Sequence, residues 1–340
     1  MNTKNLILGG ITAAIAILAL LIVMKLTSGV EKPEKRKTAE NATVQKAVLP
    51  KSGPARKKPV PVLKNDDSSS FERDAKIQRL VDELSSLNAK QAVIPQTEGI
   101  IRELCDLGDA VIPAVRKLLA SDAKASVKSA AARVLAQIGS AESVETLVNF
   151  IDSESDPASK NLYIRSIQAI DKSDASPSLI KALESSRDIY FSTEVKQAIA
   201  RTGTDETVKQ LVEACHSQNE MNAQMSNLLG ALAIVRQPET VPALSNVAAN
   251  DQNPQIRKSA LQALSGMGYP NATQSLAEMY KSEQNADRRP LIQDAISKIN
   301  NKESLGALQD IYNNKDNPEA LRKAAAKAVF TIKNGIPPAE

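Results

Sequence analysis

The chain has 340 residues, of which 42% are hydrophobic but only 3% aromatic, with 13 Gly and no Trp. This composition is typical of alanine-rich helices and argues against a β-sheet fold, which favours β-branched and aromatic residues. The net charge of +4 combines two unlike parts, because residues 1–70 hold 12 Lys/Arg and 5 Asp/Glu, whereas residues 71–340 hold 31 and 34. A slightly acidic folded part is a poor binder of phosphate backbones, so we expect no nucleic-acid partner.

A membrane segment is predicted near the amino terminus. Leu6 to Val23 form an uncharged run of 18 residues, close to the minimum that spans a hydrocarbon core of about 30 Å. We therefore predict a tail at 1–5 and a transmembrane signal-anchor at 6–26, in a bacterial inner membrane. A cleaved signal peptide is the alternative, although its apolar region is usually only about 7–15 residues long.

The side of the membrane on which the main part lies stays open. Five basic residues from Lys25 to Lys37 follow the span, and they favour a cytoplasmic main part. A short tail bearing Lys4 before an apolar run favours export, and we lean towards this outer location.

Residues 27–68 are rich in Lys, Pro and Ala and poor in large apolar side chains, so we predict a disordered linker. Ser69 and Glu72 have the spacing of a capping box, which predicts that folding begins at residue 69. Gly335 and the two prolines that follow should end the last helix, leaving 336–340 as a tail.

A repeat of about 32 residues fills 69–335. The first helix of each repeat carries an anchor, and successive anchors lie 31, 32, 32, 32, 33, 32 and 32 residues apart. The anchors are Val81, Ile112, Val144, Ser176, Val208, Val241, Thr273 and Leu305. Amphipathic helix pairs with such a period predict an all-α fold, a right-handed α-solenoid of about eight stacked pairs.

Charged residues recur in the turn between paired helices. Five repeats pair a turn carboxylate with a cation six residues later. The pairs are Asp122 with Lys128, Glu154 with Lys160, Asp251 with Arg257, Glu283 with Arg289, and Asp316 with Arg322. Together with a Pro early in the first helix, as at Pro113 and Pro242, this pattern resembles the HEAT-repeat family of armadillo-type solenoids in its short bacterial form.

The resemblance implies a structural role for these pairs. The turn carboxylate is expected to accept backbone N–H bonds, and the cation to bridge to the next carboxylate. The pattern lapses at Ser186/Ser192 and Asn219/Met225. We hypothesise that residues 184–226 form a softer joint and a partner contact. Ordinary repeat drift, with these side chains in the core, is the alternative.

The candidate partner surface is the ridge of second helices together with this joint. Its residues are Arg133, Arg165, Gln197, Lys258, Lys323, Tyr190, Phe191 and Met225. Extended solenoid surfaces suit long peptides and broad protein faces.

Catalytic chemistry finds little support in the sequence. The single His, His216, excludes the paired-His metal sites of the HEAT-like deoxyhypusine hydroxylases. Cys105 and Cys215 lie more than three repeats apart, too far for a disulfide, and Cys215 falls in a predicted core column. We expect no cofactor, no metal and no small-molecule substrate. A lyase like the HEAT-like phycobilin lyases is the enzymatic alternative.

The function predicted from these observations is that of a membrane-anchored scaffold or adaptor that binds another protein without catalysis. An architectural spacer within a membrane-associated complex is the alternative.

Overall fold

The computed structural model describes residues 67–86 and 94–335. Secondary structure in these ranges is entirely helical, which confirms the predicted all-α class for the described residues. The predicted span at 6–26, nearly all of the linker and the tail at 336–340 lie outside them. Among the described helices, none is both long enough and apolar enough to cross a membrane.

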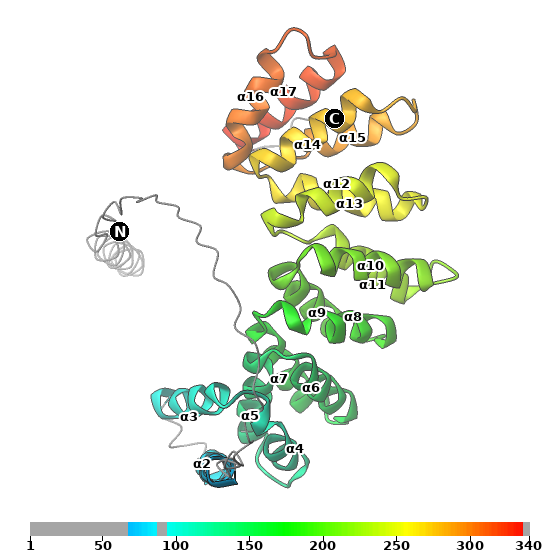
Figure 1. The fold of residues 1–340 in the computed structure, drawn as a ribbon. Coiled ribbons are helices and arrows are strands. Elements are labelled where there is room, and N and C mark those ends of the chain that lie inside the picture. The colour runs from blue at the N-terminus through cyan, green and yellow to red at the C-terminus, as the bar shows by residue number, and fades with distance from the viewer. Residues whose placement is uncertain (1–66, 87–93, 336–340) are drawn as a thin grey trace, which may run out of the picture. The chain divides into compact units, whose positions relative to one another are not determined.

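The described α-helices follow one another as eight pairs (Figure 1). The first members are α2 (Asp67–Ser86), α4 (Ile112–Ala120), α6 (Ala141–Ser153), α8 (Ser176–Ser185), α10 (Asp205–Ser217), α12 (Val241–Asn250), α14 (Pro270–Ser282) and α16 (Leu305–Asn313). The second members are α3 (Ile94–Asp106), α5 (Ala125–Ile138), α7 (Pro157–Ile164), α9 (Ile189–Thr202), α11 (Ala223–Ala233), α13 (Pro254–Met267), α15 (Arg289–Ser297) and α17 (Glu319–Asn334). Short 3₁₀ helices lie between them at η1 (Gly108–Val111), η2 (Arg165–Ala169), η3 (Ser173–Ala175), η4 (Pro238–Thr240) and η5 (Lys302–Ser304).

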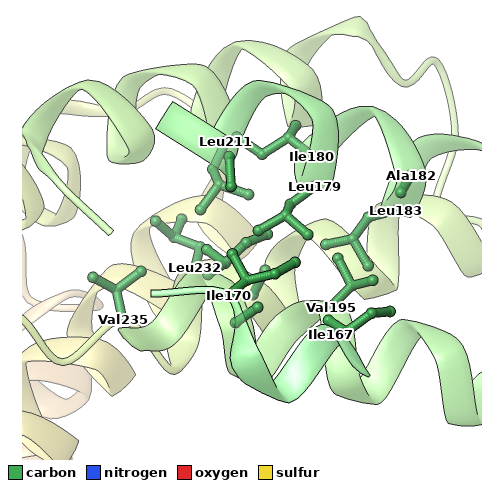
Figure 2. Packing of buried hydrophobic residues seen from close by; sticks show 14 of the residues in the cluster. Ile167, Ile170, Leu179, Ile180, Ala182, Leu183, Val195, Leu211, Leu232 and Val235 are labelled. Atoms are coloured by element: carbon green, nitrogen blue, oxygen red, sulfur yellow. The ribbon is translucent and has the colours of Figure 1, made fainter. Parts of the chain in front are cut away.

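The pairs stack as two layers. Each first helix packs on the next first helix, and each second helix packs on the next second helix, with η2 continuing α7 in its layer. Buried apolar side chains from Ile77 to Ala328 form one cluster between the layers. Figure 2 shows its middle, where Ile167, Leu179 and Leu232 of successive pairs meet. Each repeat therefore completes its core with its neighbours, as expected of a solenoid.

Two columns of mostly apolar residues, one seven positions after each first-helix anchor and one at the end of each second helix, are buried until the last pair. In the first-helix column, Leu119, Ile151 and Cys215 are buried, but Tyr312 of α16 is 49% exposed. Ile332, at the end of the second-helix column, is only half-buried. No further repeat among the described residues packs against α16 and α17, so these side chains lack the neighbour that covers their counterparts.

Two helix boundaries differ from expectation. Helix α2 begins at Asp67, so Ser69 lies inside it rather than capping it. The second helix of the third pair is short, because α7 ends at Ile164 and the chain continues as the 3₁₀ helix η2. The Ser166 hydroxyl donates to the Tyr163 carbonyl three residues earlier, a local bond that competes with regular helix geometry.

Polar side chains also join successive repeats at the ends of the second helices. Lys172 Nζ donates to the Ile138 carbonyl at 2.6 Å, and Asn301 Nδ2 donates to the Met267 carbonyl at 3.2 Å. Gln237 Nε2 likewise donates to the Arg201 carbonyl. The last carbonyls of a helix have no partner within it, so each of these donors from the following repeat satisfies a group that would otherwise be free.

Candidate interaction surface

The turn carboxylates accept backbone N–H bonds in their own turn. The Asp251, Glu283 and Glu154 side chains each accept from the amide two residues later, at 2.8, 2.8 and 2.9 Å. Bonds to an ionised acceptor are stronger than neutral ones. These three side chains therefore hold the chain at the point where it reverses direction between paired helices.

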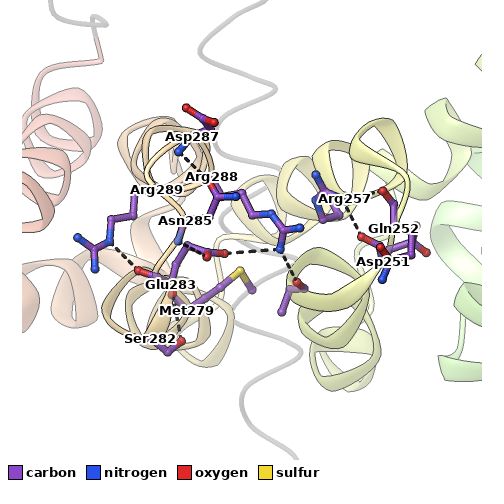
Figure 3. Close-up of polar contacts among 11 residues, drawn as sticks. Asp251, Gln252, Arg257, Met279, Ser282, Glu283, Asn285, Asp287, Arg288 and Arg289 are labelled. Atoms are coloured by element: carbon purple, nitrogen blue, oxygen red, sulfur yellow. Dashed lines mark hydrogen bonds and ion pairs between the residues drawn. The ribbon is translucent and has the colours of Figure 1, made fainter.

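The arginines of these turns bind differently from the expectation. Arg257 Nη1 donates to the carbonyls of Asp251 and Gln252 at 2.8 and 3.0 Å, and Arg289 Nε donates to the Glu283 carbonyl at 2.7 Å (Figure 3). Both cations therefore close their own turn and do not bridge to the next carboxylate. Their carbonyl acceptors lie five or six residues earlier in the same turn.

Other side chains make the contacts between neighbouring turns. His216 Nε2 lies 3.0 Å from Asp251 Oδ2 of the next repeat. Arg288 Nη1 lies 4.0 Å from Glu283 Oε2 and donates to the Ala249 carbonyl of the preceding repeat at 3.4 Å (Figure 3). The sequence pattern missed both, because neither His216 nor Arg288 occupies the recurring position six residues after the turn carboxylate.

The remaining predicted pairs make fewer contacts among the described residues. In the turns of Asp122 and Asp316 the side-chain acceptor is not the predicted carboxylate: Ser121 Oγ accepts from the Ala123 amide at 3.3 Å, and Asn314 Oδ1 accepts from the amide of Asp316 itself at 2.9 Å. Arg322 Nε is buried without a hydrogen-bond partner in the described part of the chain. Lys128 lines a surface cleft with Glu154, and Lys160 lies near enough to Asp152 to oppose the burial that raises that carboxyl's pKa.

At Ser186 and Ser192, where the charged pair is missing, uncharged hydroxyl groups make the bonds of the turn. Ser186 Oγ accepts from the Asp188 amide at 3.1 Å, and Ser192 Oγ donates to Ser186 Oγ at 3.3 Å. Asn227 Nδ2 of the next repeat donates to Ser192 Oγ at 3.3 Å. The turn at 186–188 thus has the same kind of backbone bond as its charged counterparts, made by an uncharged acceptor.

Two residues of the candidate partner surface are in the core. Phe191 is 1% exposed and Met225 is 4% exposed, so the expectation that they contact a partner is wrong. Asp188 and Asn222 cap α9 and α11 by accepting from the Phe191 and Met225 amides. This register turns both side chains inward and leaves Ile189 85% exposed, an apolar residue that the repeat pattern does not single out.

The second-helix residues lie at the surface, but two of them are already paired. Arg165, Gln197, Lys258 and Lys323 are exposed. Arg133 makes two bonds of 2.8 and 2.9 Å to the Glu98 carboxylate of α3, and this hydrogen bonding lowers the pKa of Glu98. Arg133 therefore links α5 to α3, and Lys323 pairs with Glu319 within α17 at 2.7 Å, whereas Arg165, Gln197 and Lys258 are available to a partner.

Two adjoining clefts lie on the last second helices. The first, of about 260 Å³, lies between α13 and α15 and is lined by Lys258, Leu261 and Leu291 among others. The second, of about 370 Å³, lies between α15 and α17 and includes Lys323 and Lys327. Asp294 lines both clefts. We call this surface the α13–α17 groove.

The α13–α17 groove is built from helical spacing. Its α13 side uses Lys258, Leu261, Gln262 and Ser265, which lie three or four residues apart and so share one helix face. Helix α15 contributes to both clefts, because it packs against α13 on one side and α17 on the other. The structure thus brings Lys258 and Lys323 to one surface, while Arg133, Arg165 and Gln197 lie on earlier repeats.

The sequence profile of HEAT repeats matches residues 97–162 and 223–297. These two regions of the chain are HEAT repeats. The first match runs from α3 to α7 and the second from α11 to the end of α15, so α13 and α15 of the groove belong to HEAT repeats. Comparison with curated protein sequences gives no match.

Solved structures with similar HEAT-like chains share little sequence with this one. Human deoxyhypusine hydroxylase is 16% identical, with 78% of this chain and 98% of that chain covered and a TM-score of 0.30. The CpcE–CpcF phycocyanin lyase of Nostoc sp. PCC7120 is 14% identical, covering 82% of this chain and 100% of that chain, with a TM-score of 0.28. YibA of Escherichia coli is 15% identical, covering 80% and 98%, with a TM-score of 0.30.

Proposed function

We propose that the HEAT repeats form a protein-interaction scaffold that binds another protein along its second helices. The observation that carries this proposal is the position of Lys258 and Lys323. Both are ridge residues predicted from the sequence, and both are exposed and line the adjoining clefts of the α13–α17 groove. HEAT repeats commonly act as helical scaffolds for protein contacts, and their extended surfaces suit such a role.

The proposal includes attachment to a membrane through residues 6–26, with the linker as a tether to the repeats. The uncharged run from Leu6 to Val23 supports it. Accessibility of the repeats to added protease, before and after the inner membrane is opened, tests the outer location, and sedimentation of the full-length protein with the membrane fraction tests the attachment. Digestion before that membrane is opened is the result expected. Protection until it is opened would place the repeats inside.

The two cysteines are consistent with the proposal of binding rather than catalysis, because neither is activated as a nucleophile. Burial raises the pKa of the Cys215 thiol to about 12 and that of the Cys105 thiol to about 11. A thiol must lose its proton to act as a nucleophile. At neutral pH both groups therefore stay protonated, which is the behaviour of structural cysteines.

Charge reversal tests the scaffold against the architectural alternative. We expect Lys258→Glu with Lys323→Glu to remove a partner that co-purifies with the full-length protein, while the fold is retained because both side chains are exposed. A spacer would tolerate this double variant but would fail when the linker at 27–68 is shortened. Arg165→Glu, on an earlier repeat, shows whether the contact extends beyond the groove.

A further inference from the structure

We propose that the α13–α17 groove binds an extended acidic segment of a protein partner, with one apolar side chain of that segment inserted beside Leu291. The inference rests on the proposed scaffold function and names the chemistry of its partner. It is carried by the charges, the exposed apolar side chain and the dimensions of the groove.

Positive charge is concentrated on this surface. Lys258, Lys298, Lys323 and Lys327 line the clefts, against Asp294 as the one carboxylate among the lining residues. Lys298 Nζ lies 2.7 Å from Asp294, and Lys323 Nζ lies 2.7 Å from Glu319. Lys258 and Lys327 form no ion pair with any described residue. Two ammonium groups thus stay uncompensated, on a chain whose residues 71–340 are slightly acidic in total.

An exposed apolar side chain lies in the cleft that Lys258 and Lys298 also line. Leu291 of α15 is 43% exposed, and it lines the α13/α15 cleft with the buried Leu261 and the small residues Gly266 and Ala295. A volume of about 260 Å³ is smaller than most small-molecule sites, which occupy roughly 300–1,000 Å³. The cleft therefore suits a single aliphatic side chain better than a cofactor.

The spacing of the lysines suits an extended peptide. Packed helices lie about 8–10 Å apart, so Lys258 on α13 and Lys327 on α17 are separated by two steps, about 20 Å. An extended chain rises about 3.3 Å per residue. Acidic residues six positions apart lie on the same face of an extended chain and can reach both ammonium groups. An apolar residue two or four positions after the first acidic residue shares that face and lies beside Leu291 of α15, which packs between α13 and α17.

The same features disfavour other occupants. The chain's own residues 27–68 are basic and would be repelled. Single-stranded nucleic acid is commonly bound by stacking on aromatic side chains, and none of the described residues that line the two clefts is aromatic. A carboxylate-rich peptide satisfies both the ammonium groups and the apolar cleft.

The test uses a labelled heptapeptide with Glu at positions 1 and 7, Leu at positions 3 and 5 and Ser at the other positions, so that Glu and Leu share one face when the peptide is extended. Its neutral counterpart has Gln in place of Glu, and binding is measured by fluorescence anisotropy on the full chain. We expect the acidic peptide to bind, and more weakly as salt is added. Lys258→Glu with Lys327→Glu should weaken binding at least tenfold. The matched variant Lys117→Glu with Lys209→Glu has the same charge change on the first helices α4 and α10, and it should change binding less than twofold. Leu291→Gln should weaken binding at least threefold without changing its salt dependence.

Several results would overturn the inference. These are equal binding of the acidic and neutral peptides, equal loss in the two charge-reversed pairs, no binding by the unaltered chain, or full competition by an oligonucleotide of similar length. A change in oligomeric state on reversal of Lys258 and Lys327 would assign the groove to a second copy instead. If a partner co-purifies but the groove variants retain it, the scaffold function stands and this inference fails. Absence of any partner contradicts the function itself.

Discussion

Gly268 ends α13 with a backbone φ of 61°, a left-handed conformation in which a Cβ costs roughly 1–2 kcal/mol. A Cβ at this position would also lie 2.2 Å from Asn301 Cβ of the next repeat. Gly108 has a φ of 60°, but a Cβ there would meet no heavy atom within 4 Å. The two glycines share a backbone requirement and differ only in packing.

We therefore expect Gly268→Ala to destabilise the protein by about 2–5 kcal/mol, since overpacking adds about 1–3 kcal/mol to the backbone cost. Gly108→Ala should show the backbone cost alone, about 1–2 kcal/mol. Urea unfolding followed by circular dichroism provides the comparison. Equal losses in the two variants would show that the contact with Asn301 relaxes without cost.

The Arg133–Glu98 pair gives a pH-dependent prediction. The hydrogen bond from Arg133 lowers the pKa of Glu98, so the pair contributes stability above the ordinary carboxyl pKa and loses it as the pH falls through the lower folded value. Both side chains are more than a third exposed, which limits the contribution to about 1 kcal/mol or less. Arg133→Met should lower the unfolding midpoint at pH 7, and the difference should shrink below about pH 4. Arg165→Met, at an exposed residue, is the control and should show no such pH dependence.

At the scale of single residues, burial is harder to predict than type of element. The lapsed charge pattern predicts Phe191 and Met225 at the surface, yet each lies three residues after an N-cap and points inward. Asp188 and Asn222 are visible in the sequence and could have indicated this register. Contacts between repeats, such as Lys172 with the Ile138 carbonyl, leave no local signal, because their partners lie about a full repeat away.

At the scale of helices and turns, the turn before α9 differs from the turns before α13 and α15 in the charge of the side chain that accepts the turn amide. The Asp188 amide binds the neutral Ser186, whereas the Asn253 and Asn285 amides bind carboxylates. Charge-assisted hydrogen bonds are roughly twice as strong as neutral ones. The hypothesis of a softer joint at 184–226 therefore has a specific physical basis in this turn.

We expect amides in 184–226 to exchange with deuterium faster than those in 249–289. Ser186→Asp, which restores the recurring carboxylate, should slow exchange at Asp188 by several-fold, consistent with a gain of about 1 kcal/mol. Hydrogen exchange with mass spectrometry measures both. Uniform protection across the two segments would contradict the hypothesis of a softer joint at 184–226. The exposed Ile189 would then be an isolated surface residue.

The sequence predicted the helices themselves well, because a period of about 32 residues constrains every pair at once. The eight first-helix anchors all fall in or beside the start of their helices, except Val81, which lies well inside the long α2. The break between α7 and η2, where the Ser166 hydroxyl bonds the Tyr163 carbonyl, was not predicted, because the repeat period carries no signal for it. The exposure of Tyr312 follows from its place in the last described pair and not from its own sequence context.

For the whole molecule, the shared core and the proposed recognition surface use different faces of the second helices. Stacking buries a shared core from Ile77 to Ala328, and the turns close themselves with local bonds from Arg257 and Arg289. The outer faces of the second helices present exposed side chains to solvent. Of the ridge residues predicted from the sequence, Lys258 and Lys323 line the groove. That grouping required the structure, because 65 positions separate them in sequence.

The most direct measurement is site-specific photocrosslinking in the native membrane from positions 258 and 323, with position 117 on α4 as the control and with sequencing of the attached peptide. We expect both groove positions to join the same protein through an acidic peptide, and position 117 not to do so. Adducts that form equally from all three positions, or a joined peptide that is not acidic, would contradict a recognition surface on the second helices.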